Sequence, residues 1–344
     1  MSTENYYMKL LKMMGSKRSF VRLVTVTLGI FLLFSILSPS VFLSGANFQF
    51  ILLASPELVL LAMAISVTML TAGIDLSVVG ISNVSAIVAA QIMISSGSEY
   101  SVPLAMAVAV SVGALCGLFN AALIAGLNVP PILATLGTQQ LFSGIGLVLS
   151  GGSILTGLPE NFTNIALINI AGIPLIFLLM GAVAVAVGVL VSKTKLGFQM
   201  RMVGANPTAA DYSGINRAKV LVLTYLTSGV LAGIAGLIIS SRASGANSQY
   251  GTTYILLAIV VAVLAGVDPE GGYISVAGVV IAVLTLQMLS TGLLSVQNSP
   301  HIVNIMQGAL LIFIVALNAW EPRLRTFVSS FMVKRRNKIP EKSN

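Results

Sequence analysis

The chain has 344 residues, of which 56% are hydrophobic and 8% are charged, and its formal net charge is +8. In an ordinary soluble domain roughly a quarter of all residues are charged, so this composition excludes a water-soluble surface. The apolar residues form continuous blocks of about twenty, the length that crosses a hydrocarbon core of about 30 Å, whereas barrel strands alternate apolar and polar residues. The sequence therefore predicts an all-α fold, a polytopic transmembrane helical bundle.

Hydropathy predicts about ten spans, by the length of roughly twenty residues that a span needs. In chain order they cover residues 20–41, 48–71, 76–94, 102–127, 131–150, 170–192, 219–240, 253–267, 273–293 and 302–320. We expect a basic amino-terminal segment, residues 1–22, that is retained as a signal anchor, because its charged region is long. A transmembrane domain, residues 23–320, and a basic tail, residues 321–344, follow it.

Most of the lysines and arginines lie in three clusters, at residues 9–22, 193–219 and 323–342, and each cluster flanks a span. An excess of Lys and Arg marks the cytoplasmic side of a membrane protein. Both termini and the loop 193–218 are therefore predicted to be cytoplasmic, and the tail is expected to meet anionic membrane lipid. The charge pattern reports topology, so we expect no nucleic-acid partner.

The second predicted span ends in a helix break at Thr71–Ser77. Gly73 interrupts the helix, and Asp75 is placed to cap the next one through its carboxylate, which suits the positive end of a helix. An ionisable group near membrane depth also leaves ion binding open as an alternative. Glu57, in the outer half of the same span, is the other such group.

The cytoplasmic loop contains a short predicted helix in the segment Gly204–Arg217. Asn206 fits its cap, Pro207 its first turn and Gly214 its end. A compact helix with small side chains outside the membrane suits docking on another protein. A solvated connector is the alternative, which composition leaves open.

Four motifs together resemble one family. They are TAGIDLSV at residues 71–78, NVPPILATLGT at residues 128–138, the loop segment at residues 204–217, and Gly271-Gly272. The chain resembles the permease subunit of a bacterial ABC importer of the ribose, xylose and galactose type, a family that includes the autoinducer-2 permeases. It departs from the family pattern at Ala72, at Asn120-Ala121 and at residues 266–270, and the resemblance does not specify the solute.

The resemblance implies a multi-pass protein of the bacterial inner membrane with several partners. Cytoplasmic ATPase subunits would bind the ATP and dock on the loop, a second permease copy or a homologue would complete the path, and an extracytoplasmic binding protein would deliver the solute. The implied ATPase-coupling residues are Gly204, Asn206, Ala209, Ala210, Gly214 and Arg217.

A path for a sugar or another small polar solute needs amides and hydroxyls rather than strong charge. The intramembrane candidates are Asn83, Gln91, Asn120, Thr135, Thr138, Gln139 and Gln287. Each of these side chains is also suited to bonding between helices.

The sequence favours transport without an ATPase site in this chain, because it lacks the Gly-x-x-x-x-Gly-Lys-Ser/Thr phosphate loop. We expect no catalytic residue, no metal site and no cofactor in this chain, since Cys116 and His301 are its single cysteine and histidine. An ion-coupled secondary carrier or channel is the alternative function, and an intramembrane enzyme is a remote one.

Overall fold

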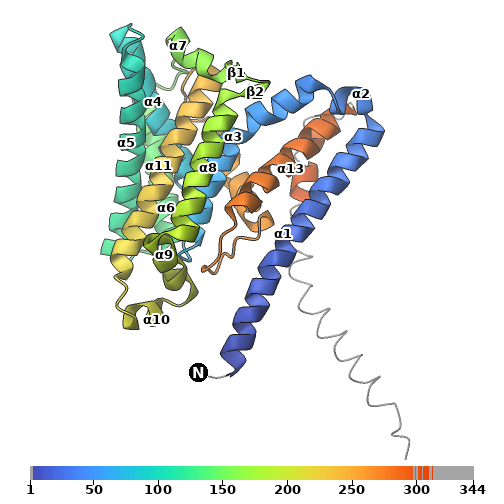
Figure 1. The fold of residues 1–344 in the computed structure, drawn as a ribbon. Helices are drawn as coiled ribbons and strands as arrows, with labels where there is room; N and C mark the ends of the chain where they lie inside the picture. Colours follow the sequence, from blue (N-terminus) through green and yellow to red (C-terminus); the bar gives the residue numbers. More distant parts are fainter. Residues whose placement is uncertain (1–2, 297–298, 300, 304, 310–311, 313–344) are drawn as a thin grey trace, which may run out of the picture.

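The computed structural model describes residues 3–296, 299, 301–303, 305–309 and 312, and these residues are almost entirely helical (Figure 1). The α-helices are α1 (Thr3–Leu37), α2 (Pro39–Phe42), α3 (Gly45–Met69), α4 (Val78–Ser96), α5 (Ser101–Ala121), α6 (Pro131–Ser150), α7 (Glu160–Thr163), α8 (Leu175–Lys193), α9 (Lys195–Ala205), α10 (Pro207–Tyr212), α11 (Arg217–Ala243), α12 (Tyr254–Leu264) and α13 (Val276–Ser295). The remaining elements are the π-helix η1 (Ala122–Gly126), the 3-10 helix η2 (Asn164–Ala166), and the antiparallel strands β1 (Asn169–Ile170) and β2 (Ile173–Pro174).

Eight helices within the described residues are long and apolar enough to cross a membrane. They are residues Phe20–Leu37 of α1, α3, α4, Ser101–Gly126 (α5 with η1), α6, α8, α11 and α13. The predicted fold class, a polytopic helical membrane protein, is confirmed. The exact number of spans, the cytoplasmic placement of the termini and the division into three segments stay predictions.

Two predicted spans differ from the structure or fall outside it. In place of a span at 253–267 the chain forms α12, which has 11 residues and rises only about 16 Å, roughly half of the hydrocarbon core. The segment before α12, from Ser244 to Thr253, is not helical and consists largely of turns. The predicted span 302–320 lies mostly outside the described residues, and the tail 321–344 lies outside them entirely.

Local chemistry moves two other boundaries. The first span ends at Leu37 rather than at residue 41, because the residue before Pro39 is driven out of the helical region and Ser38 adopts φ −144°. The span predicted at 170–192 begins at Leu175, since the β1–β2 hairpin occupies the preceding residues.

The centre of the bundle is formed by α3 and α11. Residues Leu58 to Met69 of α3 are buried on every side, the pattern of a helix surrounded by protein. On the other side, α11 packs on α5 through glycines: a Cβ at Gly113 would collide with the carbonyl oxygen of Gly229, and Gly117 also lies against Gly229. Small residues let membrane helices approach this closely.

The two ends of the bundle carry different structures. Figure 1 shows α9 and α10 together at one end, while α7 and the β1–β2 hairpin lie at the opposite end. The long helices α3, α4, α5, α6, α8 and α11 connect the two ends. With the predicted topology, α9 and α10 face the cytoplasm.

Candidate functional site

Three segments that are far apart in the sequence meet near α9. The Gly272 N–H donates to the carbonyl oxygen of Leu70 at 3.0 Å. Gly204 of α9 packs so tightly on both residues that a Cβ there would overlap them. Glycine allows this close backbone approach because it has no side chain. Leu70, Gly204, Gly271 and Gly272 thus form a contact that we call the inner joint.

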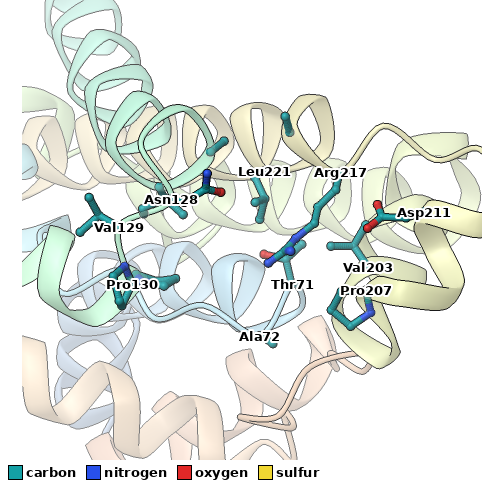
Figure 2. Close-up of a pocket in the computed structure, with 14 residues that line it drawn as sticks. Thr71, Ala72, Asn128, Val129, Pro130, Val203, Pro207, Asp211, Arg217 and Leu221 are labelled. Carbon is teal, nitrogen blue, oxygen red and sulfur yellow. The ribbon is translucent and has the colours of Figure 1, made fainter.

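A pocket of about 400 Å³ opens beside the inner joint. The helix break, the NVPP motif and the loop each contribute to its lining, which includes Thr71, Ala72, Asn128, Pro130, Asp211 and Arg217. Figure 2 shows the Arg217 side chain pointing across the pocket toward Thr71. The pocket therefore adjoins both the loop helix and the break between α3 and α4.

The loop helix α10 has distinct start and stop signals. The Asn206 side chain caps it, since its Oδ1 accepts the Ala209 N–H at 2.9 Å, and Pro207 occupies the first turn. The chain leaves the helix through Gly214, whose φ of +74° favours glycine. α10 is therefore a defined six-residue element, held between α9 and α11.

The six residues predicted to couple the loop to an ATPase differ in exposure. Ala210 is 0% exposed and Gly204 belongs to the inner joint, so both hold the loop on the bundle. Those that are exposed are Asn206, Ala209, Gly214 and Arg217. Sequence reasoning missed Tyr212, which ends α10 and is 90% exposed. An exposed aromatic side chain is a typical anchor of a protein interface, so its residue type was the available signal.

Asp75 links three helices at the break. Its Oδ1 accepts the Ser77 N–H at 3.0 Å and the Ser77 hydroxyl at 2.6 Å, while its Oδ2 accepts the Ser228 hydroxyl at 2.8 Å. Asn120 of α5 donates to the Ser77 hydroxyl oxygen at 2.7 Å. The buried carboxylate thus supports the start of α4, where Ser77 is the cap residue, and connects α4 to α11 and α5. Gly73 lies two residues before it, against the Tyr225 hydroxyl.

The seven residues predicted to line a path mostly form hydrogen bonds between segments. Asn120, Thr135, Thr138 and Asn83 are at most 3% exposed. Backbone carbonyl oxygens accept most of their hydrogen bonds: those of Ser248 and Tyr250 accept from Asn83, that of Leu149 from Gln91, that of Ile74 from Thr135, that of Thr135 from Thr138 and that of Ala54 from Gln287. Asn120 donates to the Ser77 hydroxyl oxygen, and Gln139 accepts the N–H of Gly80. Gln91 also lines a shallow pocket near Leu155. Contact with a solute stays a prediction for these seven residues.

The nonhelical segment Ser244–Thr253, which we call the broken segment, lies between the predicted spans 219–240 and 253–267, but its contacts were not predicted from the sequence. Asn83 Nδ2 donates to the carbonyl oxygens of Ser248 and Tyr250, each at 2.9 Å, and Ala246 pairs with Leu155 through two backbone hydrogen bonds. These contacts hold the segment against α4 and the chain that follows α6. Its small and polar residues were the available signal, but they lie within a largely apolar region.

Glu57 clamps both ends of the broken segment. This carboxylate on α3 is 1% exposed and accepts Arg242 Nε at 3.1 Å and Nη2 at 2.5 Å. It also accepts the Tyr254 hydroxyl at 2.6 Å. Arg242 lies near the end of α11 and Tyr254 begins α12, so one buried group fixes the helices on either side of the broken segment.

Comparison with known proteins decides the family. Residues 47–315 match the model of the family described as the permease component of the branched-chain amino acid transport system. The chain belongs to this permease family. No solved structure matches the permease.

Several curated relatives of the permease are about one-third identical to it. It is 32% identical to the D-allose transport system permease protein AlsC of Escherichia coli over an alignment of 286 residues, and this alignment covers 83% of this chain and 87% of AlsC. It is also 32% identical over 312 residues to the galactose/methyl galactoside import permease protein MglC of Escherichia coli, covering 86% and 93% of the two chains. It is 31% identical over 288 residues to the autoinducer 2 import system permease protein LsrD of Yersinia enterocolitica, covering 81% and 85%.

The family and the apolar helices together establish a multi-pass permease of the inner membrane. The resemblance inferred from the four motifs is confirmed, and these relatives include permeases of sugar and autoinducer-2 systems. The inner joint connects α9 to the break between α3 and α4, and α10 contributes to the lining of the pocket beside it.

Proposed function

We propose that this permease, paired with a second copy or a homologue, forms the translocation path of an ATP-driven importer for a sugar or a sugar-like small polar solute. Cytoplasmic ATPase subunits bind and hydrolyse the ATP, and an extracytoplasmic binding protein delivers the solute. The names of the relatives support the solute class, because AlsC, MglC and LsrD are named for D-allose, galactose and autoinducer 2.

The inner joint is the observation that supports this proposal most directly. A partner that moves α10 also moves α9, and Gly204 of α9 touches the carbonyl of Leu70 without an intervening side chain. Leu70 directly precedes the break, where Asp75 connects α4 to α11. Displacement of the loop is thereby passed to three membrane helices through backbone contacts and short hydrogen bonds.

An importer of this kind is expected to load neutral solutes without an ion gradient. The two acidic residues that an ion-coupled carrier would use are already engaged in the described chain: Glu57 pairs with Arg242, and Asp75 accepts three hydrogen bonds. Opening either site would leave a buried carboxyl group without its hydrogen-bond partners in the membrane, which is costly.

The test is uptake by vesicles that contain the permease together with the ATPase and binding protein encoded beside it. Tyr212→Ala and Ala209→Glu change the exposed side of α10; removing an aromatic anchor is expected to weaken docking by about 2 kcal/mol. Tyr212→Phe is the matched control, since it keeps an aromatic ring at the same 90% exposed position.

We expect D-allose or galactose uptake that requires ATP and both partners, that is reduced by the two α10 changes, and that is unaffected by the control. Uptake that persists without ATP, or that follows an imposed ion gradient, would contradict the proposal and favour the ion-coupled carrier. ATPase stimulation that survives both α10 substitutions would remove α10 from the docking surface.

A further inference from the structure

The exposed face of α8 is apolar until its last turn. Exposed residues recur every three or four positions, at Leu178, Ala182, Val185 and Val189, so they form one stripe along the helix. Lys193, the last residue of α8, continues this stripe one turn after Val189 and is also exposed. Such a stripe suits lipid chains along the helix and the headgroup layer at its end, where a lysine extends its ammonium group out of the hydrocarbon.

The start of α9 is fixed against this end of α8. Thr194 joins the two helices, and its hydroxyl oxygen accepts the Gly197 N–H at 3.1 Å. A Cβ at Gly197 would overlap the carbonyl oxygens of Leu190 and Val191, so the turn leaves no room for a side chain. Figure 1 shows α9 directly at the end of α8. Contact with α8 therefore sets the position of residues 195–198.

α9 lies across the ends of two membrane helices. Gly197 touches α8, and Gly204 touches Leu70, which directly follows α3. Seven residues of helix separate these contacts by about 10 Å, and packed helices are about 8–10 Å apart. α9 thus bridges α8 and α3 at the level of their ends, which in a membrane is the layer of the lipid headgroups.

The outward side of α9 combines positive charge with an apolar ring. Lys195 is exposed, and Phe198, one turn later, is 55% exposed. Gly197, Met200 and Val203 are buried against the bundle. Helices that lie in the membrane interface typically present lysine or arginine together with phenylalanine, tryptophan or leucine. The first turn of α9 has this character.

No acidic residue neutralises the two lysines. The sequence contains no Asp or Glu from residue 161 to residue 210, and neither Lys193 nor Lys195 forms an ion pair with a residue that the structure describes. Arg242 differs, because its guanidinium is paired with Glu57. The two ammonium groups are thus available to an anion from outside the chain.

We propose that Lys193, Lys195 and Phe198 form a binding surface for the headgroup of an anionic phospholipid. The lipid phosphate and the two ammonium groups have complementary charges, and the acyl chains follow the apolar stripe of α8. The Phe198 ring packs among the acyl chains next to the headgroup. A soluble anion would use the two charges but not the stripe, so a lipid fits this surface better.

The bound lipid anchors the helix that leads to the inner joint. Lys195 and Phe198 are in the first turns of α9, and Gly204 near its end contacts Leu70. A lipid held at the start of α9 therefore restrains the helix through which motion of α10 reaches the break. The surface itself depends neither on the solute nor on the proposed function.

Lipid binding by the full-length permease, stripped of lipid in nonionic detergent, tests the surface. The probe is dioctanoyl phosphatidylglycerol, dioctanoyl phosphatidylcholine is the headgroup control, and native mass spectrometry counts the bound lipid. The test variant is Lys193→Gln/Lys195→Gln. The matched control is Arg217→Gln/Lys219→Gln, which removes two exposed cations at the start of α11. α11 has no exposed residue from Val220 to Arg242, so these two cations adjoin no lipid-facing stripe.

We expect the wild-type permease to bind phosphatidylglycerol at least about tenfold more tightly than phosphatidylcholine, because each lysine near a membrane surface contributes about fivefold. The test variant should lose this preference and the matched control should keep it. Phe198→Gln should weaken binding of both lipids by about fivefold, because it removes apolar contact rather than charge. The basic tail is present in both double variants, so lipid that it binds does not alter the comparison.

Two outcomes would overturn the inference. One is an equal headgroup preference in the two double variants. The other is release of phosphatidylglycerol when the ATPase binds the wild-type permease, because that would assign the surface to the ATPase. Both test lysines are exposed, so the test variant should melt at the wild-type temperature in lipid-free detergent, which separates lost binding from misfolding.

Discussion

Replacing Arg242 by leucine removes the cation that faces the buried carboxylate of Glu57. In the native chain this carboxylate accepts two hydrogen bonds from Arg242 and one from Tyr254. After the substitution only the tyrosine hydroxyl remains, and the carboxylate is 1% exposed, so water cannot substitute for the lost guanidinium. The clamp on the broken segment is thereby left with an uncompensated charge.

The structure predicts an order of effects for this clamp. Removing one partner of a buried ion pair costs about 3–5 kcal/mol, which is the expectation for Arg242→Leu. Glu57→Gln should cost less stability, about 1–3 kcal/mol, because the glutamine amide still forms hydrogen bonds with its neighbours. The Arg242 side chain that loses its carboxylate is 31% exposed, so it is only partly buried. Replacing both residues by leucine removes both charges and should be milder than Arg242→Leu alone.

Thermal unfolding of the purified permease in detergent measures this order. Each kcal/mol shifts the melting temperature by about 2–4 °C in a domain of 150–250 residues and by less in a longer chain, so Arg242→Leu should lower it by about 5 °C. Lys193→Leu removes an exposed cation and serves as the control. Our reasoning is refuted if Glu57→Gln is the more damaging single change, or if the double variant is as unstable as the sum of the two single ones.

Three further substitutions test the packing. Gly229→Val should lower the free energy of unfolding by at least about 3 kcal/mol, and with it the yield of folded protein, because the valine side chain meets the backbone of Gly113. Gly181→Val, on the open face of α8, should be tolerated, and equal yields of the two variants would contradict the contact. Ala72→Gly should raise the melting temperature, since Ala72 has φ +60° and relief of a left-handed residue is worth about 1 kcal/mol. Tyr225→Phe should not destabilise, because no described residue bonds the buried hydroxyl; a loss above about 1 kcal/mol would reveal a partner.

The loop helix illustrates what local sequence can specify. Asn206, Pro207 and Gly214 each act on their own backbone neighbourhood, through a cap, a fixed φ and a left-handed turn, and the structure has α10 between them. Such signals are readable because they require no knowledge of the rest of the chain.

The path residues illustrate what local sequence cannot specify. Asn83 and Gln140 are both intramembrane amides, and nothing in their immediate sequence tells which one is turned inward. Burial of Asn83 depends on the broken segment, more than 160 residues away in the chain, which provides two carbonyl acceptors. Such long-range hydrogen bonds arise only when the helices are assembled.

Composition by itself determined that this chain is a polytopic helical membrane protein, because hydrocarbon imposes apolar helices of a set length on any sequence that crosses it. The four motifs, through their resemblance to one family, indicated a permease of the inner membrane. Tertiary structure alone decided that α12 is half a span, that Glu57 is paired and that Tyr212 is exposed. These features depend on which surfaces meet, and that is settled by contacts between residues distant in the sequence: Glu57 and Arg242 are separated by 185 positions.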